Sequence, residues 1–383
     1  MILITILIFA VVLSVLVFVH EAGHFVVAVR NGIKAEEFGF GFPPRAIGVV
    51  KNDETGKWDI VKGGDDTYRK NTIYSLNWIP FGGFVRMKGE DGVEPGPDSF
   101  ASKSAWVRIK VLAAGVFMNF VLAWVLISLV LFMGFPQAVD ESNRPAAKDI
   151  HVEILMVAKD SPAEVMKLKP GDTIVSLDGT AITGIDQARD YILSKKGMEI
   201  AMTVDRSGRR LTLSGTPRTE YPENQGALGI SFAETAFVSY SWYQAPIEGA
   251  KATYNTTLTI LGALGGMVKN LFVGKAAGID VTGPVGIVVL TKQMSDLGLA
   301  YLLQFAALLS INLGIFNILP IPALDGGRVF FILIEKLKGS PVSQRIEGGF
   351  HQVFFVLLLL LMVLVTIKDL SQFKILEKLG HLF

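Results

Sequence analysis

The chain has 383 residues, half of them hydrophobic, and a mean hydropathy of +0.45, which makes it too apolar for an ordinary soluble protein and too long for one domain. Its 36 Lys and Arg residues balance 35 Asp and Glu residues, so the overall charge gives no reason to expect a nucleic-acid partner. Because the chain has no cysteine, any zinc site must use His and carboxylate side chains.

Residues 1–30 are predicted to form the first transmembrane helix. Residues 1–19 carry no charged side chain, and the basic start and cleavage site of a removable signal peptide are missing. The helix then carries His20-Glu-Ala-Gly-His24, so two imidazoles share one face and Glu21 is turned about 60° from His24. Burying three ionisable groups at membrane depth costs free energy, and such groups are usually functional. The alternative is a chance match to the motif, with the His and Glu side chains hydrogen-bonded to neighbouring helices.

The two histidines suit a catalytic zinc ion. Two imidazoles and one carboxylate, with a fourth position left open, are a ligand set of metalloproteases. Glu21 could act as the general base, taking a proton from the water that attacks a peptide carbonyl and later passing it to the leaving amine. The third ligand must come from another part of the chain at the same depth.

Residues 38–90 are predicted to form a membrane-associated β region. Short alternating stretches at 46–51, 57–62 and 72–78, separated by Gly, Asp and Pro, are typical of small β-hairpins. Apolar runs that begin at Phe38 and at Trp78 suggest that the sheet dips toward the membrane. An ordinary cytoplasmic β subdomain is the alternative.

A second transmembrane helix is predicted at 106–135, followed by a linker at 136–149 and a soluble αβ domain at 150–235. Within the helix, Asn119 follows small residues and is expected to hydrogen-bond a neighbouring helix rather than to act in catalysis. In the soluble domain a helix start, a Pro-Gly-Asp turn and an apolar strand follow one another, with no second copy of the pattern.

Three more apolar segments follow. Residues 245–290 include a stretch at 252–268 that is diluted by Asn and Thr, which favours an interfacial, amphipathic helix. The ranges 297–327 and 348–368 are predicted to be the third and fourth transmembrane helices, which gives four spans in all.

The third predicted span breaks at its end, which reads Asn317-Ile-Leu-Pro-Ile-Pro-Ala-Leu-Asp325-Gly-Gly. Pro320 and Pro322 remove backbone donors, which membrane proteins tolerate where a protein-lined, wetted site is present. If the first and third spans run in the same direction, Asp325 reaches the two histidines and can complete a His₂Asp site; a cap on the following helix is its alternative. Asn317 could donate to a substrate carbonyl or oxyanion, or could bind freed helix backbone.

Charged residues beside the spans predict the orientation of the chain. Basic residues follow the first span and open the second, whereas acidic residues follow the far end of the second: Arg30, Lys34, Arg108, Lys110, Asp140 and Glu141. This places the β region on the cytoplasmic side, and the soluble domain and both termini outside. The remaining histidines have no partner at ligand spacing and are expected at surface or interfacial positions: His151, His351 and His381.

With these residues in hand, the chain resembles the bacterial site-2 proteases, specifically the regulator of sigma-E protease group, over essentially its full length. The resemblance is carried by the two metal motifs with a PDZ-like segment between them, and by Gly39-Phe-Gly41, Pro80-Phe-Gly-Gly-Phe-Val-Arg and Gly283-Pro-Val-Gly-Ile. It implies a multi-pass α-helical membrane protein with four transmembrane helices, a membrane-associated β-sheet loop and one extracytoplasmic PDZ (α+β) domain. Some members of the group carry two PDZ domains in tandem, whereas one is visible here.

The resemblance also implies an activity. Proteins of this type are zinc metalloendopeptidases of the bacterial cytoplasmic membrane that cut single-span membrane proteins, such as anti-sigma factors or remnant signal peptides, in or near their transmembrane segments. His20, His24 and Asp325 would bind Zn²⁺, and Glu21 would be the catalytic base. The substrate would add a strand to the sheet, and the PDZ domain would capture its C-terminal carboxylate or shade the entrance. Candidate substrate-binding residues are Asn317, Gly39, Gly41, Pro320 and Pro322.

Two other classes of protein fit part of the pattern. A catalytically silent membrane scaffold would use the PDZ-like segment for binding and the metal for structure, but a structural zinc site needs no unligated carboxylate such as Glu21. A metal transporter would use intramembrane His and Asp as pathway ligands. That reading leaves the PDZ-like segment unexplained and lacks repeated ligands on the other spans.

Overall fold

The computed structural model of the chain describes residues 2–64, 71–90, 96–141, 143–206, 208–222, 225–274, 282–340 and 342–372. Its contacts define two compact units. The first comprises Met1–Leu129 together with Pro246–Phe383, and the second is Val130–Ala245. The chain therefore leaves the first unit once and returns to it.

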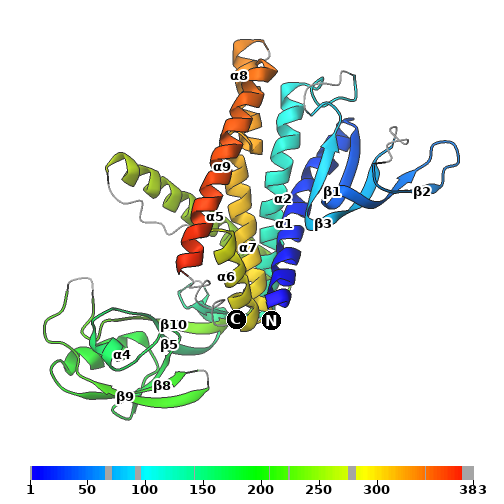
Figure 1. Ribbon diagram of the computed structural model, residues 1–383. Coiled ribbons are helices and arrows are strands. Elements are labelled where there is room, and N and C mark those ends of the chain that lie inside the picture. The colour runs from blue at the N-terminus through cyan, green and yellow to red at the C-terminus, as the bar shows by residue number, and fades with distance from the viewer. Residues whose placement is uncertain are drawn as a thin grey trace, which may run out of the picture. The chain divides into compact units, whose positions relative to one another are not determined.

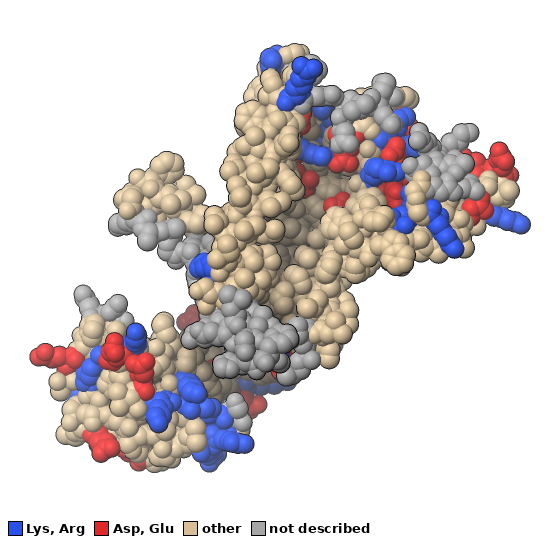
Figure 2. All heavy atoms as spheres, in the orientation of Figure 1, with Lys and Arg blue, Asp and Glu red and all other residues tan. Residues whose placement is uncertain are grey.

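The first unit is a helical bundle with a small sheet (Figure 1). Its helices are α1 (Ile2–Arg30), α2 (Ala105–Met133), α5 (Ala245–Phe272), α6 (Pro284–Leu297), α7 (Leu299–Ile318), α8 (Asp325–Lys338) and α9 (Gln344–Gln372). Among the described residues, four helices are long and apolar enough to cross a membrane: Leu3–Arg30, Ala105–Met133, Leu299–Ile318 and Arg345–Ser371. In Figure 2, charged side chains gather over the sheet and at the bundle end that carries α8, whereas the exposed side of the bundle is largely uncharged.

α1 and α2 cross closely. A Cβ atom on Gly23 of α1 would lie 2.4 Å from the carbonyl oxygen of Ala114 in α2. Small residues at a crossing let helix backbones approach, which is how helices associate when lipid removes the hydrophobic driving force. The predicted role of the small residues before Asn119 is therefore confirmed.

The Gly283-Pro-Val-Gly-Ile motif begins α6 and joins it to α9. The buried carboxylate of Asp369 in α9 accepts backbone N–H bonds from Gly283 at 3.2 Å and Gly286 at 2.7 Å. A Cβ atom on Gly283 would lie 2.8 Å from Cγ1 of Val365, so glycine is needed for this approach. A carboxylate at a helix N-terminus satisfies free N–H groups and complements the helix dipole.

The β region is a three-stranded antiparallel sheet of order β2-β1-β3, formed by β1 (Ala35–Lys51), β2 (Trp58–Val61) and β3 (Ile73–Met87). The predicted stretch at 57–62 is β2, which pairs with the end of β1, so this short hairpin is confirmed. The predicted stretches at 46–51 and 72–78 are parts of two long, irregular strands, because the apolar runs continue β1 and β3. Gly41 has φ +81°, and a Cβ atom there would lie 2.5 Å from the carbonyl oxygen of Ile79. The register shifts that surround it are typical of β-bulges.

The second unit is built on an antiparallel sheet of order β4-β10-β5-β6-β8-β9, with β7 paired to β6. A core of Val, Ile, Leu and Met side chains lies within it. Its elements are β4 (Phe135–Ala138), η1 (Arg144–Ala146), β5 (Ala147–Val157), α3 (Pro162–Val165), β6 (Thr173–Leu177), β7 (Thr180–Ala181), α4 (Ile185–Ser194), β8 (Ile200–Arg206), β9 (Arg209–Gly215) and β10 (Ile230–Val238).

Several boundaries differ from the predicted ranges. The predicted linker at 136–149 contributes β4, which pairs with β10, so the second unit exceeds 150–235; a proline is tolerated because β4 is an edge strand. The segment 245–290 contains all of α5 and the first part of α6. The range 297–327 is α7, a loop and the start of α8, because two prolines end the helix, and α9 extends past 348–368 at both ends.

Candidate metal centre

Two histidines of α1 and one aspartate of α8 meet inside the first unit. Nε2 of His20 lies 3.0 Å from Nε2 of His24 and 3.0 Å from Oδ2 of Asp325, and Nε2 of His24 lies 3.4 Å from the same carboxylate oxygen. Both imidazoles are buried, at 6% and 5% exposed. The sequence predicted that these three side chains come together, and the structure brings them together.

The spacing of the three atoms fits a metal ion. Zinc bonds of about 2.0–2.2 Å place the ligand atoms of a tetrahedral site about 3.3–3.6 Å from one another. The observed separations of 3.0 to 3.4 Å are close to this. Lone pairs that face one another in a buried site repel unless positive charge lies between them, so the geometry requires a cation or a proton at its centre.

The hydrogen bond behind His24 prepares its ligand atom. Nδ1 of His24 lies 2.8 Å from the carbonyl oxygen of Val111 in α2. A carbonyl oxygen can only accept, so Nδ1 carries the proton, and the neutral ring presents the lone pair of Nε2 toward Asp325. Metal-binding histidines are usually oriented by such a bond.

Asn119 occupies the corresponding place behind His20. Its Nδ2 lies 2.9 Å from Nδ1 of His20, and its Oδ1 is buried without a hydrogen-bond partner in the described part of the chain. When Nε2 of His20 serves as a ligand, Nδ1 carries the proton and needs an acceptor. A 180° rotation of the Asn119 carboxamide places Oδ1 next to Nδ1 and supplies that acceptor. We therefore assign the rotated orientation to the Asn119 side chain.

Gly115 of α2 makes room for the two rings. A Cβ atom at this position would lie 2.3 Å from Nε2 of His24 and 2.9 Å from Cε1 of His20. Any side chain here would occupy the space in front of the imidazoles. Together with the spacing and the ring hydrogen bonds, this cradle shows that the residues present fit a bound zinc ion.

Asp325 stands in the first turn of α8, directly after the proline-containing loop. The N-cap residue is Leu324, with no side-chain capping bond, and the carboxylate of Asp325 is turned toward His20 instead. The alternative that Asp325 caps α8 is therefore wrong. Cβ atoms on Gly326 and Gly327 would lie 2.2 Å and 2.4 Å from loop carbonyl oxygens, so the loop folds back tightly against the start of the helix.

A cavity of about 310 Å³ opens at the cluster and is lined by Glu21 and Asn317 as well as by the three clustered side chains. Nδ2 of Asn317 lies 3.4 Å from Nε2 of His20. Arg328 and Glu90, which form an ion pair, also line this cavity. Among the described residues that line it, the other predicted substrate-binding positions do not appear, and their roles stay predictions: Gly39, Gly41, Pro320 and Pro322.

The remaining described histidines, His151 and His351, are not part of the cluster. Nδ1 of His151 lies 2.7 Å from the carbonyl oxygen of Asp149 in the second unit, and His381 lies outside the described residues. His351, expected at a surface or interfacial position, is partly exposed and accepts a hydrogen bond at 2.8 Å from the backbone N–H of Ala323, two residues before Asp325. No spacing pattern in the sequence predicts this contact.

The chain is similar to known zinc metalloproteases. The family model of Peptidase family M50 matches residues 8–64 and 65–361. The chain is 33% identical over 360 residues to a putative zinc metalloprotease of Clostridium acetobutylicum, covering 93% of this chain and 94% of the relative. It is 30% identical over 451 residues to the regulator of sigma-W protease RasP of Bacillus subtilis, covering 96% of this chain and 98% of that protein.

A search of solved structures finds PDZ domains of SdrC-like proteins. Those of Listeria monocytogenes and Listeria innocua are 25% and 26% identical to this chain, cover 21% of it, and align with a TM-score of 0.20. The alignments cover 86% and 92% of the two solved chains.

The fold and the site define a membrane-embedded metallopeptidase. The chain belongs to Peptidase family M50 and is a zinc metalloprotease of the site-2 type.

Proposed function

We propose that this protease cuts single-span membrane proteins in or near their transmembrane segments. One observation carries the proposal: two zinc-ligand side chains of α1, a helix long and apolar enough to cross a membrane, meet a third at the start of α8, which follows the equally suitable helix α7, and an acidic side chain lines the same cavity. A hydrolytic site at that depth can reach peptide bonds that soluble proteases cannot reach.

His20, His24 and Asp325 would hold the zinc ion, which when bound would supply Lewis-acid polarisation and a water molecule with a pKa lowered to about 7. Glu21, on the same helix, takes the proton of the attacking water and returns it to the leaving amine. Nδ1 of each histidine is occupied by a hydrogen bond, which keeps both rings oriented. Asn317 lies beside His20 and donates to the substrate carbonyl as negative charge develops on its oxygen.

The substrate reaches this site as an extended strand. A helix must open before its peptide bonds can be attacked, and the open segment then needs partners for its backbone. β3 lies at an edge of the three-stranded sheet, and an edge strand has unpaired N–H and C=O groups that can bind such a segment. Gly39 and Gly41 lie where the register of β1 shifts, so β1 can bulge there.

The active site faces the cytoplasm, and the second unit is an extracytoplasmic PDZ domain in the bacterial cytoplasmic membrane. The basic residues near the histidine end of α1 and at the start of α2 support this orientation. The second unit begins at Val130, in the last turn of α2 at its opposite end. It captures a freshly exposed C-terminal carboxylate of a substrate or shades the entrance to the site.

The test is Glu21→Gln in the full-length protein, co-expressed with a single-span membrane protein. The variant is expected to keep its zinc and to lose cleavage, because Gln cannot accept the proton. Glu36→Gln, the same change at a residue of the sheet paired with Arg86, is the control and is expected to cleave normally. Cleavage by Glu21→Gln would reject the assignment, and zinc transport without proteolysis by the unmodified protein would favour a transporter.

A further inference from the structure

The loop that delivers Asp325 has an unusual backbone. Between Leu319 and Leu324 it contains Pro320 and Pro322, which have no N–H group, and Ala323 has φ +83°. Residues other than glycine rarely adopt this left-handed conformation. Ala323 therefore keeps it only because surrounding contacts hold the backbone there. Asp325 follows two residues later, so the direction of its carboxylate depends on this turn.

A residue of another helix holds the turn. The N–H groups of Ile321 and Leu324 bond to carbonyl oxygens within the loop, whereas the N–H of Ala323 donates to Nδ1 of His351 in α9 at 2.8 Å. A backbone N–H can only donate, so Nδ1 of His351 is the acceptor.

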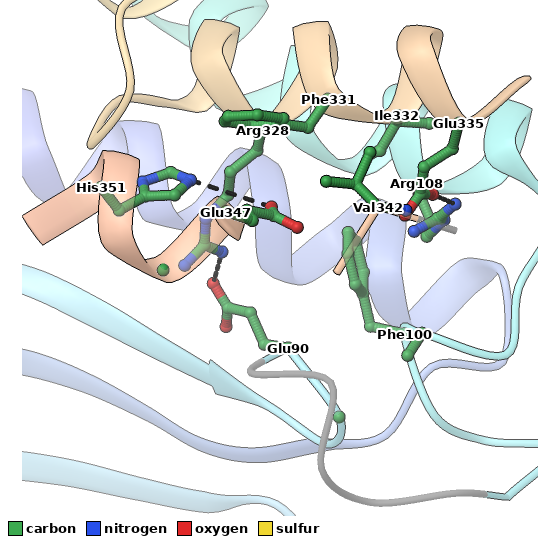
Figure 3. Close-up of a pocket in the computed structure, with 13 residues that line it drawn as sticks. Glu90, Phe100, Arg108, Arg328, Phe331, Ile332, Glu335, Val342, Glu347 and His351 are labelled. Atoms are coloured by element: carbon green, nitrogen blue, oxygen red, sulfur yellow. Dashed lines mark hydrogen bonds and ion pairs between the residues drawn. The ribbon is translucent and has the colours of Figure 1, made fainter. Parts of the chain in front are cut away.

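The ring of His351 is itself fixed on two other sides. Its Nε2 lies 3.8 Å from the carboxylate of Glu347, one turn earlier in α9, and its ring centroid lies 5.8 Å from that of Phe331 in α8. The ring lines a cavity of about 630 Å³, and Figure 3 shows it there beside Glu347 and Arg328. The acceptor therefore has a defined position from which to hold the loop.

We propose that His351 is a positioning residue of the metal centre: by accepting the N–H of Ala323, it holds the loop so that Asp325 reaches the two histidines. This inference rests on the proposed metal site. Loss of the acceptor would leave a partly buried N–H unpaired beside a strained residue, and the loop would relax toward an ordinary backbone conformation and withdraw the carboxylate. Gly326 and Gly327 fix the other side of Asp325, so relaxation of the loop would not be absorbed there.

Three substitutions separate this role from general packing. The Oδ1 atom of Asn can take the place of Nδ1, whereas the Oε1 atom of Gln lies near the position of Nε2, and Phe keeps a ring without an acceptor. Zinc affinity of the purified full-length protein, measured by competition with a chelator, is expected to fall roughly 10–100-fold for His351→Gln and His351→Phe, as for other groups behind metal ligands, and to stay near the unmodified value for His351→Asn.

The control is Thr366→Val, further along α9, because the Thr366 hydroxyl bonds within its own helix to the carbonyl oxygen of Met362. It is expected to bind zinc as the unmodified protein does. Equal zinc affinities for the Asn and Gln variants would overturn the inference. If the Phe variant does not fold, the comparison of zinc affinity between the Asn and Gln variants still decides. Unmodified protein without zinc would instead overturn the proposed metal site.

Discussion

Nδ1 of His20 lies 2.9 Å from the carboxamide of Asn119, across the contact between α1 and α2. The bond joins His20, the first predicted metal ligand, to α2. The sequence predicted that Asn119 hydrogen-bonds a neighbouring helix and has no catalytic role. Asn119 is thus placed to orient the ring of His20, the proposed ligand.

Asn119→Leu removes the acceptor behind His20 at similar volume. Zinc affinity is expected to fall roughly 10–100-fold, because the Nδ1 proton loses its partner and the ring can rotate. Asn119→Asp keeps an acceptor and is expected to bind zinc better than the Leu variant. Chelator competition measures both, with Ser128→Ala as the control because Ser128 bonds to Trp124 within α2. Equal zinc binding by the Leu and Asp variants would show that the contact only packs the helices.

Gly115→Ala tests the cradle in front of the rings. The added methyl group would lie 2.3 Å from Nε2 of His24, so the ring must move and the ligand atom with it. Zinc affinity should fall by at least the roughly 10–100-fold that more distant changes cost. Gly262→Ala in α5 is the matched control, because a Cβ atom there has nothing within 4 Å. Normal zinc content in Gly115→Ala protein would refute the close approach.

Asp369→Asn tests the junction between α6 and α9. The carboxylate accepts two backbone N–H bonds while buried, and its neutral replacement weakens both bonds. The free energy of unfolding should fall by roughly 1–3 kcal/mol, whereas zinc binding is retained. Asp296→Asn, whose exposed carboxylate pairs with Lys292 on α6, should change stability by less than about 1 kcal/mol. Denaturant titration of detergent-solubilised protein compares the two, and equal losses would argue against a structural cap.

The buried pair of Glu37 and Arg45 should make the sheet sensitive to acid. Burial acts to raise the pKa of Glu37, but bonds from Arg45 at 2.8 and 2.6 Å outweigh it, so the pKa lies below its ordinary value of 4.5. A lowered pKa means that Glu37 stabilises the fold above its unfolded pKa and that this contribution is lost as the pH falls through the folded value.

The protection of amide hydrogens in β1 and β3, expressed relative to the intrinsic exchange rate at each pH, should therefore fall as the pH drops below the ordinary Glu value of 4.5. Glu37→Gln protein cannot titrate at this position and should show a flatter dependence. If the two proteins respond to acid identically, the ion pair does not govern the stability of the sheet.

The sequence predicted the parts of the site that short motifs encode. His20, Glu21 and His24 follow from helical spacing, and Asp325 follows from the paired prolines that stop α7 near the same end of the bundle. It could not predict that Ala323 turns to positive φ or that His351 holds it, because this contact joins residues 28 positions apart without a periodic pattern. Tertiary contacts, not local propensity, decide such positions.

The strands show the same limit. The Gly and Pro residues of β1 interrupt its alternation, so sequence analysis divided a strand that β3 holds together by pairing. β4 appeared to be a linker because its partner, β10, comes nearly a hundred residues later. A short edge strand such as β4 is identified by its pairing with a distant strand, which the local sequence does not show.

The most direct test of the account measures zinc in purified His20→Ala/His24→Ala protein by elemental mass spectrometry, beside the unmodified chain and a His151→Ala control. The account predicts one zinc ion per chain in the unmodified and control proteins and none in the double variant. A double variant that keeps its zinc undiminished would contradict it.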